Sequence, residues 1–427
     1  MAGKYYEIRD VVYGFVRLDQ QEWDIVNHSV FQRLRRIKQL SLTDMVYPGA
    51  VHTRLEHSIG VMQMASDIFD SITSKERAKS LLRDHYDLND DGIKRYRKII
   101  RLAALLHDIG HSPFSHAGEG LMPLKSPNSK ERFDHEEYSI AIIKKYFQSL
   151  IEDHPLSANH PIKVEEVTAL LGDPVKCSFQ GIILLFKGII SGQLDADRAD
   201  YLLRDSIHTG VSYGLYDKDR LINCIDIGQI HESEALVLAI QDGGWNIAES
   251  LVIARYQMFS QVYFHKTRRA YDHHISSAVK EILNNCYPEL CGCYPTPDDL
   301  DQYVTFDDWT VYGKLKEGQG GKHGDIILKR QHYRKVYETD LIPTMEQEKE
   351  LADKVSWLEE NGIDEFFIDE AKTKWYKMDK DILISSEKTG FVRELSNLSP
   401  IVKSMVDNPR IKRLYVEKSK GDSIGYD

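Results

Sequence analysis

The chain has 427 residues, of which 42% are hydrophobic and 28% charged, a composition typical of a globular protein with one large domain and an appended smaller one. No stretch approaches the roughly 20 apolar residues of a membrane span, and the charged N-terminus lacks a signal-peptide core, so we expect a cytoplasmic protein without a membrane partner. The net charge of −11 disfavours a coat on duplex nucleic acid but allows a phosphate-bearing substrate in a locally basic pocket.

The N-terminal 290 residues carry mostly helical patterns. The first 50 predict a strand-like entry and then helices with a break near residues 27–29. The stretch RLEHSIGVMQMASDIFDSI has apolar residues three and four apart and predicts an amphipathic helix. After it we expect a polar helix, an acidic turn at Asn89–Gly92 and a buried apolar helix. Further helices are predicted at 136–152, 163–172, 181–191, 196–207, 218–224 and 246–285.

The pattern changes near residue 295. KEGQGGKHGD predicts a loop, while DEFFIDEAKTKWY, DILISSE and RLYVEK alternate like short strands. We therefore predict a mainly α fold: a helical domain at 1–290, with its core at about 50–210, and a smaller α+β region at 291–427.

The cysteines are too few and odd in number for a disulfide framework. Three of them cluster in CYPELCGC, but three thiols without a fourth ligand make an incomplete zinc site, so we expect incidental thiols. The five are Cys177, Cys224, Cys286, Cys291 and Cys293.

The stretch HDIGHSPFSH places His107 and Asp108 at the end of a fully apolar helix. Burying an unpaired carboxylate is costly, and a divalent metal removes the cost because it binds ionised carboxylate and neutral imidazole. The HD pair alone is more often a capped helix end. With His57 on an earlier helix and one of the aspartates of QLDADRADYLLRDS on a later helix (Asp195, Asp197, Asp200 or Asp205), it forms a His…His-Asp…Asp set typical of a metal site drawn from three helices.

The blocks RLEH, HDIGHSPFSH, FDHE and DADRADYLLRD resemble the signature blocks of HD-superfamily phosphohydrolases. More narrowly, they resemble the deoxynucleoside triphosphate triphosphohydrolases, meaning the SAM-and-HD type enzymes and bacterial dGTPases. The resemblance covers about residues 6–275, and we see no SAM domain before the HD region. It implies an HD-domain helical core. It also implies an enzyme that splits a dNTP into deoxynucleoside and inorganic triphosphate by water attack at the α-phosphorus. It also implies one divalent ion (Mn, Fe, Mg or Zn) on His57, His107, Asp108 and Asp197.

The resemblance implies further site residues. The catalytic histidines would be His116, His111 and His135, with His116 the preferred proton donor and Glu119 a carboxylate that orients it. The substrate contacts would be Gln39, Leu40, Arg54, Arg198, Tyr201, Asp205 and Tyr271. An activator-nucleotide site would include Asp10, Gln32 and Arg35, for which ordinary salt bridges are an equal alternative. The expected partners are a nucleotide substrate, an allosteric nucleotide and further copies of the chain, in a dimer-based tetramer or hexamer.

Two positions depart from the family pattern. Tyr263 stands where the SAM-and-HD enzymes carry a phosphate-binding arginine, and Thr267 replaces a histidine. The candidates to compensate are His265, Lys266, Arg268 and Arg269.

Three other functions compete with this hypothesis. A zinc protease is disfavoured because Gly110 and Pro113 break the helix that an H-E-x-x-H motif needs. An HD-type phosphodiesterase or nuclease acting on single-stranded nucleic acid or another nucleotide remains the alternative, since it would use the same metal chemistry. Nucleic acid is not favoured because RLRRIK and HKTRR lack interleaved aromatic residues. A non-catalytic scaffold is disfavoured because every expected metal position is filled.

Overall fold

The computed structural model describes residues 5–157, 160–172, 180–372, 381–405 and 410–420. Within these ranges helices dominate and the strands form three small sheets, which confirms the predicted mainly α fold with a smaller α+β C-terminal region. None of the described helices is both long and apolar enough to cross a membrane.

The N-terminal segment is a hairpin followed by two short helices. Strands β1 (Tyr6–Asp10) and β2 (Gly14–Leu18) pair antiparallel. Helix α1 (Gln20–Asn27) starts at Asp19, whose side chain accepts a hydrogen bond from Glu22 N at 3.0 Å. Helix α2 (Ser29–Gln32) follows after His28, which confirms the break predicted near 27–29.

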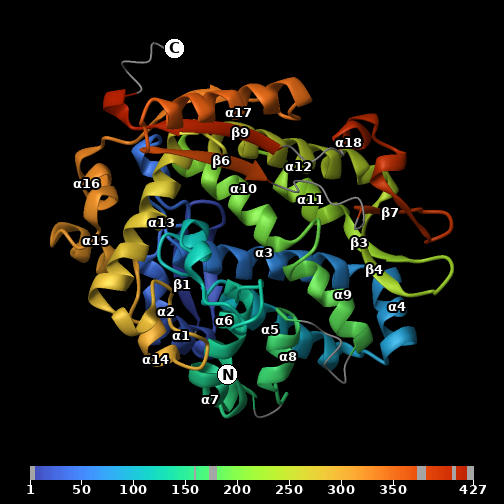
Figure 1. Cartoon of the computed structure of the whole chain (residues 1–427). Helices are drawn as coiled ribbons and strands as arrows, with labels where there is room; N and C mark the ends of the chain where they lie inside the picture. Colours follow the sequence, from blue (N-terminus) through green and yellow to red (C-terminus); the bar gives the residue numbers. More distant parts are fainter. Residues whose placement is uncertain (1–4, 158–159, 173–179, 373–380, 406–409, 421–427) are drawn as a thin grey trace.

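Three helices form the centre of the molecule in Figure 1: α3 (Arg54–Ser74), α5 (Asp90–Leu106) and α10 (Ala196–Thr209). Helix α3 is buried along most of its length, with α5 and α10 packed against it. The side chain of Asn89 accepts a hydrogen bond from Gly92 N at 2.9 Å and so starts α5 at the predicted acidic turn. Because α3, the end of α5 and the start of α10 converge, the polar residues at these places are brought together.

Shorter helices and a strand pair surround this centre. The helix predicted at 246–285 is divided, because the chain passes through a π-helical turn at Phe259–Tyr263 and restarts where His265 caps the next helix. Strands β3 (Ile225–Gln229) and β4 (Leu236–Gln241) lie between the helices predicted at 218–224 and 246–285, where the sequence predicted no element. The elements are α4 (Glu76–Tyr86), α6 (His135–Ile142), α7 (Gln148–Glu152), α8 (Val164–Ala169), α9 (Gln180–Ile190), α11 (Lys218–Cys224), β3 (Ile225–Gln229), β4 (Leu236–Gln241), α12 (Trp245–Met258) and α13 (Lys266–Cys286).

The C-terminal part adds α14 (Leu300–Tyr303), α15 (Asp308–Lys316), α16 (Gly321–Lys329), β5 (Arg334–Glu338), α17 (Met345–Glu360), β6 (Phe366–Lys372), β7 (Leu383–Ser385), β8 (Val392–Glu394), α18 (Pro400–Ser404) and β9 (Arg410–Val416). The strands predicted in DILISSE and RLYVEK are present, and the one in DEFFIDEAKTKWY is present as far as Lys372, beyond which the prediction lies outside the described residues. The loop predicted at KEGQGGKHGD was wrong from Gly321 on, where α16 begins.

Two sheets connect this part to the helical core. In the sheet β5-β9-β6 the strands are antiparallel, and Leu351 and Leu358 of α17 pack on Leu414 and Val416 of β9. Figure 1 shows this sheet and α17 at one end of the molecule. In the other sheet β7 pairs with β4, so that it takes strands from both sides of residue 290. The division into domains at that residue stays a prediction.

Candidate metal centre and adjoining cavity

The four residues expected to bind metal meet where α3, α5 and α10 converge. His57 Nε2 lies 3.0 Å from Asp197 Oδ1 and 3.5 Å from Asp108 Oδ2. His107 Nε2 lies 3.2 Å from Asp108 Oδ1 and 3.9 Å from Asp197 Oδ1. The structure thus brings two imidazoles and two carboxylates together from three separate helices.

The donor set fits a divalent cation. Among the described atoms, His57 Nε2 and His107 Nε2 are buried and have no hydrogen-bond partner. The other nitrogen of each ring is engaged, because His57 Nδ1 donates to Asp200 Oδ2 at 2.8 Å and His107 Nδ1 donates to the carbonyl of Ala104 at 2.8 Å. With a cation bound, each ring would keep its proton on Nδ1 and present the lone pair of Nε2 to the ion, as a metal ligand does.

The charges at this centre also favour a cation. Burial by itself would lower the pKa of His57, but the neighbouring carboxylates of Asp197, Asp200 and Asp108 raise that pKa to about 10. Burial by itself would raise the pKa of Asp108, but Arg54 and the neighbouring histidines hold it well below its usual range. The carboxylates therefore stay ionised and attract positive charge.

A second cluster lies beside the first. Glu119 Oε1 is 2.8 Å from His135 Nδ1, 3.0 Å from His116 Nδ1 and 3.6 Å from His111 Nδ1. His111 connects the two clusters, because its Nε2 lies 3.4 Å from Asp108 Oδ1 and its ring stacks on that of His135 at 3.9 Å. The side chain of His116 is 64% exposed, whereas that of His111 is 1% exposed. Of these two, His116 is the one that a ligand reaches.

His111 and His135 differ in charge, although their rings stack. Burial, Arg54 and His135 hold the pKa of His111 well below its usual range, so this ring is neutral. Burial opposes protonation of His135 as well, but Glu119 outweighs it and raises the pKa of that ring.

Gly110 determines how close α6 comes to the HD pair. A Cβ atom at this position would lie 2.2 Å from the carbonyl oxygen of His135, which no side chain allows. Gly110 N donates to Ser139 Oγ at 2.9 Å, and this hydroxyl donates to the carbonyl of His107 at 2.6 Å. The glycine expected only to stop a helix therefore also lets α6 bring His135 to Glu119.

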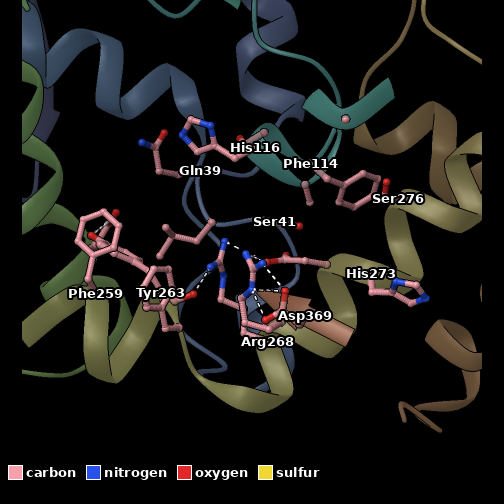
Figure 2. A pocket seen from close by; sticks show the side chains of 18 of the residues that line it. Gln39, Ser41, Phe114, His116, Phe259, Tyr263, Arg268, His273, Ser276 and Asp369 are labelled. Atoms are coloured by element: carbon pink, nitrogen blue, oxygen red, sulfur yellow. Dashed lines mark hydrogen bonds and ion pairs between the residues drawn. The ribbon is translucent and has the colours of Figure 1, made fainter. Parts of the chain in front are cut away.

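A cavity of about 680 Å³ opens beside His116. In Figure 2, Gln39 and His116 lie above it, and Tyr263, Arg268 and Asp369 lie below it. Gln39 Oε1 is buried, and among the described atoms it has no hydrogen-bond partner. The expected substrate residues that line the cavity are Gln39, Leu40, Arg54, Tyr201 and Asp205.

Two family models match the chain: the HD domain over residues 54–204 and the HD associated region over residues 216–414. The chain belongs to the HD-domain family. An uncharacterized protein of Methanocaldococcus jannaschii is 38% identical over 277 residues, which are 64% of this chain and 49% of that protein. An uncharacterized protein of Bacillus subtilis is 34% identical over 263 residues, 61% of this chain and 52% of that protein. This chain thus spans about half the length of these relatives.

Other similar proteins have functional names or known structures. The deoxynucleoside triphosphate triphosphohydrolase SAMHD1 homolog of Dictyostelium discoideum is 25% identical over 384 residues, which are 90% of this chain and 68% of that protein. The crystal structure of a hypothetical protein from Aquifex aeolicus matches with a TM-score of 0.77 and 28% identity over 98% of this chain and 99% of that one. A phosphohydrolase from Bacteroides thetaiotaomicron shares the fold, with a TM-score of 0.72, at 24% identity over 97% of this chain and all of that one.

Two expected substrate residues of this HD protein are not among the residues that line the cavity. Arg198 binds Asp195 and the carbonyl of Gly192 and lines a separate hollow beside α9 and β4. Tyr271 stacks on His332, with ring centroids 5.0 Å apart. Their roles in substrate binding stay predictions.

The expected activator residues have different hydrogen-bond partners. Gln32 Oε1 accepts a hydrogen bond from Arg35 Nε at 3.1 Å. Asp10 instead accepts a hydrogen bond from buried Arg204, at 2.8 Å. An activator site on these three residues stays a prediction.

The cavity has cationic residues that the sequence identified only as alternatives. Arg268 and Arg269 line it, whereas His265 and Lys266 do not. Arg269 Nε donates to Asp369 Oδ2 of β6 at 3.0 Å, and Arg268 Nε donates to Thr43 Oγ1 at 2.9 Å. Asp369 had no signal in the sequence, because its alternating surroundings predict a strand and nothing about its partner.

The described cluster of His273, His274 and His323 does not fit a second metal ion. His274 Nε2 accepts a hydrogen bond from Tyr333 N at 3.2 Å, so its Nδ1 carries the proton and pairs with His323 Nδ1 at 2.8 Å. That leaves His274 no lone pair for an ion. The described cysteines are free thiols, namely Cys224, Cys286, Cys291 and Cys293, while Cys177 lies outside the described residues.

Proposed function

We propose that this HD-domain protein hydrolyses deoxynucleoside triphosphates to deoxynucleosides and inorganic triphosphate with one bound divalent cation. The observation that carries the proposal is the position of the His57–His107–Asp108–Asp197 centre beside a cavity lined by Arg54 and His116. The name of the Dictyostelium relative supports the substrate class.

The cation held by those four residues would polarise a phosphate oxygen and lower the pKa of a bound water. Arg54 lies at the edge of this centre, where it pairs with Asp108, donates through Nε to Ser115 Oγ at 2.8 Å and lines the cavity. Its guanidinium would bind the α-phosphate of a nucleotide that enters there. A phosphate bound there would lie next to the residues that hold the cation.

The leaving 5′-oxygen needs a proton when water attacks the α-phosphorus and the P–O5′ bond breaks. His116 is accessible from the cavity, and Glu119 holds its Nδ1 at 3.0 Å, which leaves Nε2 to donate the proton. Leu40 and Tyr201 would pack on the sugar, and Gln39 Oε1 would accept a hydrogen bond from the nucleoside.

The test is incubation with each dNTP and NTP in Mn²⁺, with products separated by chromatography. Nucleoside plus inorganic triphosphate supports the proposal, while monophosphate plus pyrophosphate contradicts the assigned bond. Cleavage of a single-stranded oligonucleotide without dNTP turnover would favour the phosphodiesterase alternative.

Variants connect the activity to the metal centre. We expect Asp108→Ala to lose both bound metal and turnover, because a ligand and the partner of Arg54 are removed together. The control is Asp70→Asn on the same α3 that carries His57. Asp70 forms an ion pair with exposed Arg97, so this variant should retain both bound metal and turnover. Light scattering with and without dNTP would test the expected homo-oligomer.

A further inference from the structure

A chain of buried ion pairs leads away from His57 on the side opposite the metal centre. His57 Nδ1 donates to Asp200 Oδ2 at 2.8 Å, and the same carboxylate accepts hydrogen bonds from Arg204 Nε at 2.8 Å and Nη2 at 2.9 Å. Arg204 Nη1 then donates to Asp10 Oδ2 at 2.8 Å. The four side chains are at most 5% exposed, so water supports none of these charges.

The backbone is shaped to accommodate this chain of charges. Gly60 lies three residues after His57 on α3, and a Cβ atom there would lie 2.1 Å from both Arg204 Nη2 and Asp200 Oδ1. At the other end, Asp10 Oδ1 accepts hydrogen bonds from the main-chain N–H groups of Val12 at 2.8 Å and Tyr13 at 3.1 Å. The β1–β2 turn therefore fixes the last carboxylate.

Stability alone does not explain such an arrangement. Taking two carboxylates and a guanidinium out of water is costly, and well-packed apolar residues often serve a fold as well or better. A carboxylate on the second ring nitrogen of a metal-binding histidine, in contrast, fixes its tautomer and its orientation and raises its basicity. Asp200 does this for His57, Arg204 balances the charge of Asp200, and Asp10 holds Arg204 in place.

We propose that Asp200, Arg204 and Asp10 are positioning residues that set the metal affinity of His57. The N-terminal hairpin is thereby part of the metal site, although Asp10 touches no metal ligand. The inference rests on the metal centre of the proposed function but not on the nucleotide as substrate.

The experiment is a calorimetric titration of metal-free protein with Mn²⁺. We expect Asp200→Asn to bind Mn²⁺ about 10- to 100-fold more weakly than the wild type. Asp10→Asn, which keeps an acceptor for the turn but loses a charge, should show a smaller loss. Arg204→Lys should retain more affinity than Arg204→Met, because the lysine keeps the positive charge between the two carboxylates.

The control is Glu166→Gln, which removes another buried carboxylate that pairs with an arginine, Arg95, but touches no metal ligand. It should lower the unfolding temperature and leave Mn²⁺ affinity unchanged. The inference is overturned if folded Asp200→Asn binds Mn²⁺ like the wild type, or if Glu166→Gln weakens binding as much. Should Asp200→Asn not fold, Asp10→Asn decides, and wild-type affinity in that variant overturns the inference.

The same titration separates this inference from the proposed function. Wild-type protein that binds no Mn²⁺ would contradict the metal centre itself, and the inference with it. Wild-type protein that binds Mn²⁺ and hydrolyses no dNTP would contradict only the substrate assignment, and the affinity series would still test the positioning residues.

Discussion

Asp308, at the start of α15, joins the two loops that line the cavity. Its Oδ1 accepts a hydrogen bond from Phe114 N at 2.7 Å, and its Oδ2 accepts one from Lys38 N at 2.9 Å. Phe114 and Ser115 have φ angles of 59° and 55°, a region that costs a residue with a side chain about 1–2 kcal/mol. The carboxylate therefore holds a strained loop in the conformation that presents His116.

The two hydrogen bonds that the Asp308 carboxylate accepts determine how much its removal should lower the free energy of unfolding. Asp308→Ala leaves the buried N–H of Phe114 and the half-buried N–H of Lys38 without an acceptor, at about 1–3 kcal/mol for the buried group and less for the other, so the free energy of unfolding should fall by about 1–4 kcal/mol. Asp308→Asn keeps one acceptor oxygen and should lose about half as much. Because the loops carry Gln39 and His116, both variants should raise KM for the nucleotide.

The pH dependence of stability gives the sharper test. Burial raises the pKa of Asp308 to about 7, although the two N–H groups and Lys38 favour the carboxylate, whereas an aspartate in the unfolded chain titrates near 3.8. Between these values the folded state binds more protons than the unfolded state. The contribution of Asp308 to the free energy of unfolding is thus fully present below the lower value and falls by about 1.4 kcal/mol per pH unit as pH rises toward 7.

The assay is urea unfolding of wild type and Asp308→Asn at several pH values from about 5 to 8. Taking the difference between the two proteins cancels the titrations that they share. The advantage of the wild type should shrink as pH rises to neutrality and then stay constant. A difference that is the same at every pH would refute the reasoning.

Three further predictions concern the site. His116→Ala should keep Mn²⁺ binding and lose about 10²–10⁴-fold in kcat, and normal turnover would transfer the proton donor role to His135 or His111. Asp369→Asn frees Arg269 from its ion pair and should lower KM for triphosphates more than for monophosphates in steady-state assays; an unchanged ratio contradicts a phosphate-binding role for Arg269. Gly110→Ala places a Cβ atom against α6 and should lower the free energy of unfolding by about 1–3 kcal/mol, whereas a wild-type value in urea denaturation would show that α6 can retreat without cost.

The candidate metal centre was predictable only as a set, because each of its polar residues taken singly is more often a cap or a surface group. The choice of its four residues as ligands came from the family resemblance and stays a prediction. His107 and Asp108 end α5, while His57 and Asp197 lie on α3 and α10 with apolar neighbours. Their distances could not be predicted, since they depend on how closely three helices approach. Asp200 and Arg204 carried a weaker signal, being four residues apart on one helix face.

No pattern in the sequence predicted the hydrogen bonds that hold the HDIGHSPFSH loop in place. Arg33 Nη2 donates to the carbonyl of His111 at 2.8 Å, and Tyr303 OH donates to the carbonyl of Gly110 at 2.7 Å. The accepting groups belong to the main chain, which every residue possesses, so no residue type marks them. The donors lie 78 and 193 positions away from their acceptors.

These contacts follow from ending a buried helix inside the protein. Beyond Leu106 the main chain is no longer helical, and its buried carbonyl and N–H groups need partners that a helix would have supplied. Arg33, Tyr303 and Asp308 supply them, two of these from the region after residue 290. An irregular loop with three histidines therefore keeps one conformation only when the C-terminal part packs against it. For this reason the candidate site is a property of the whole described chain rather than of the HD motif alone.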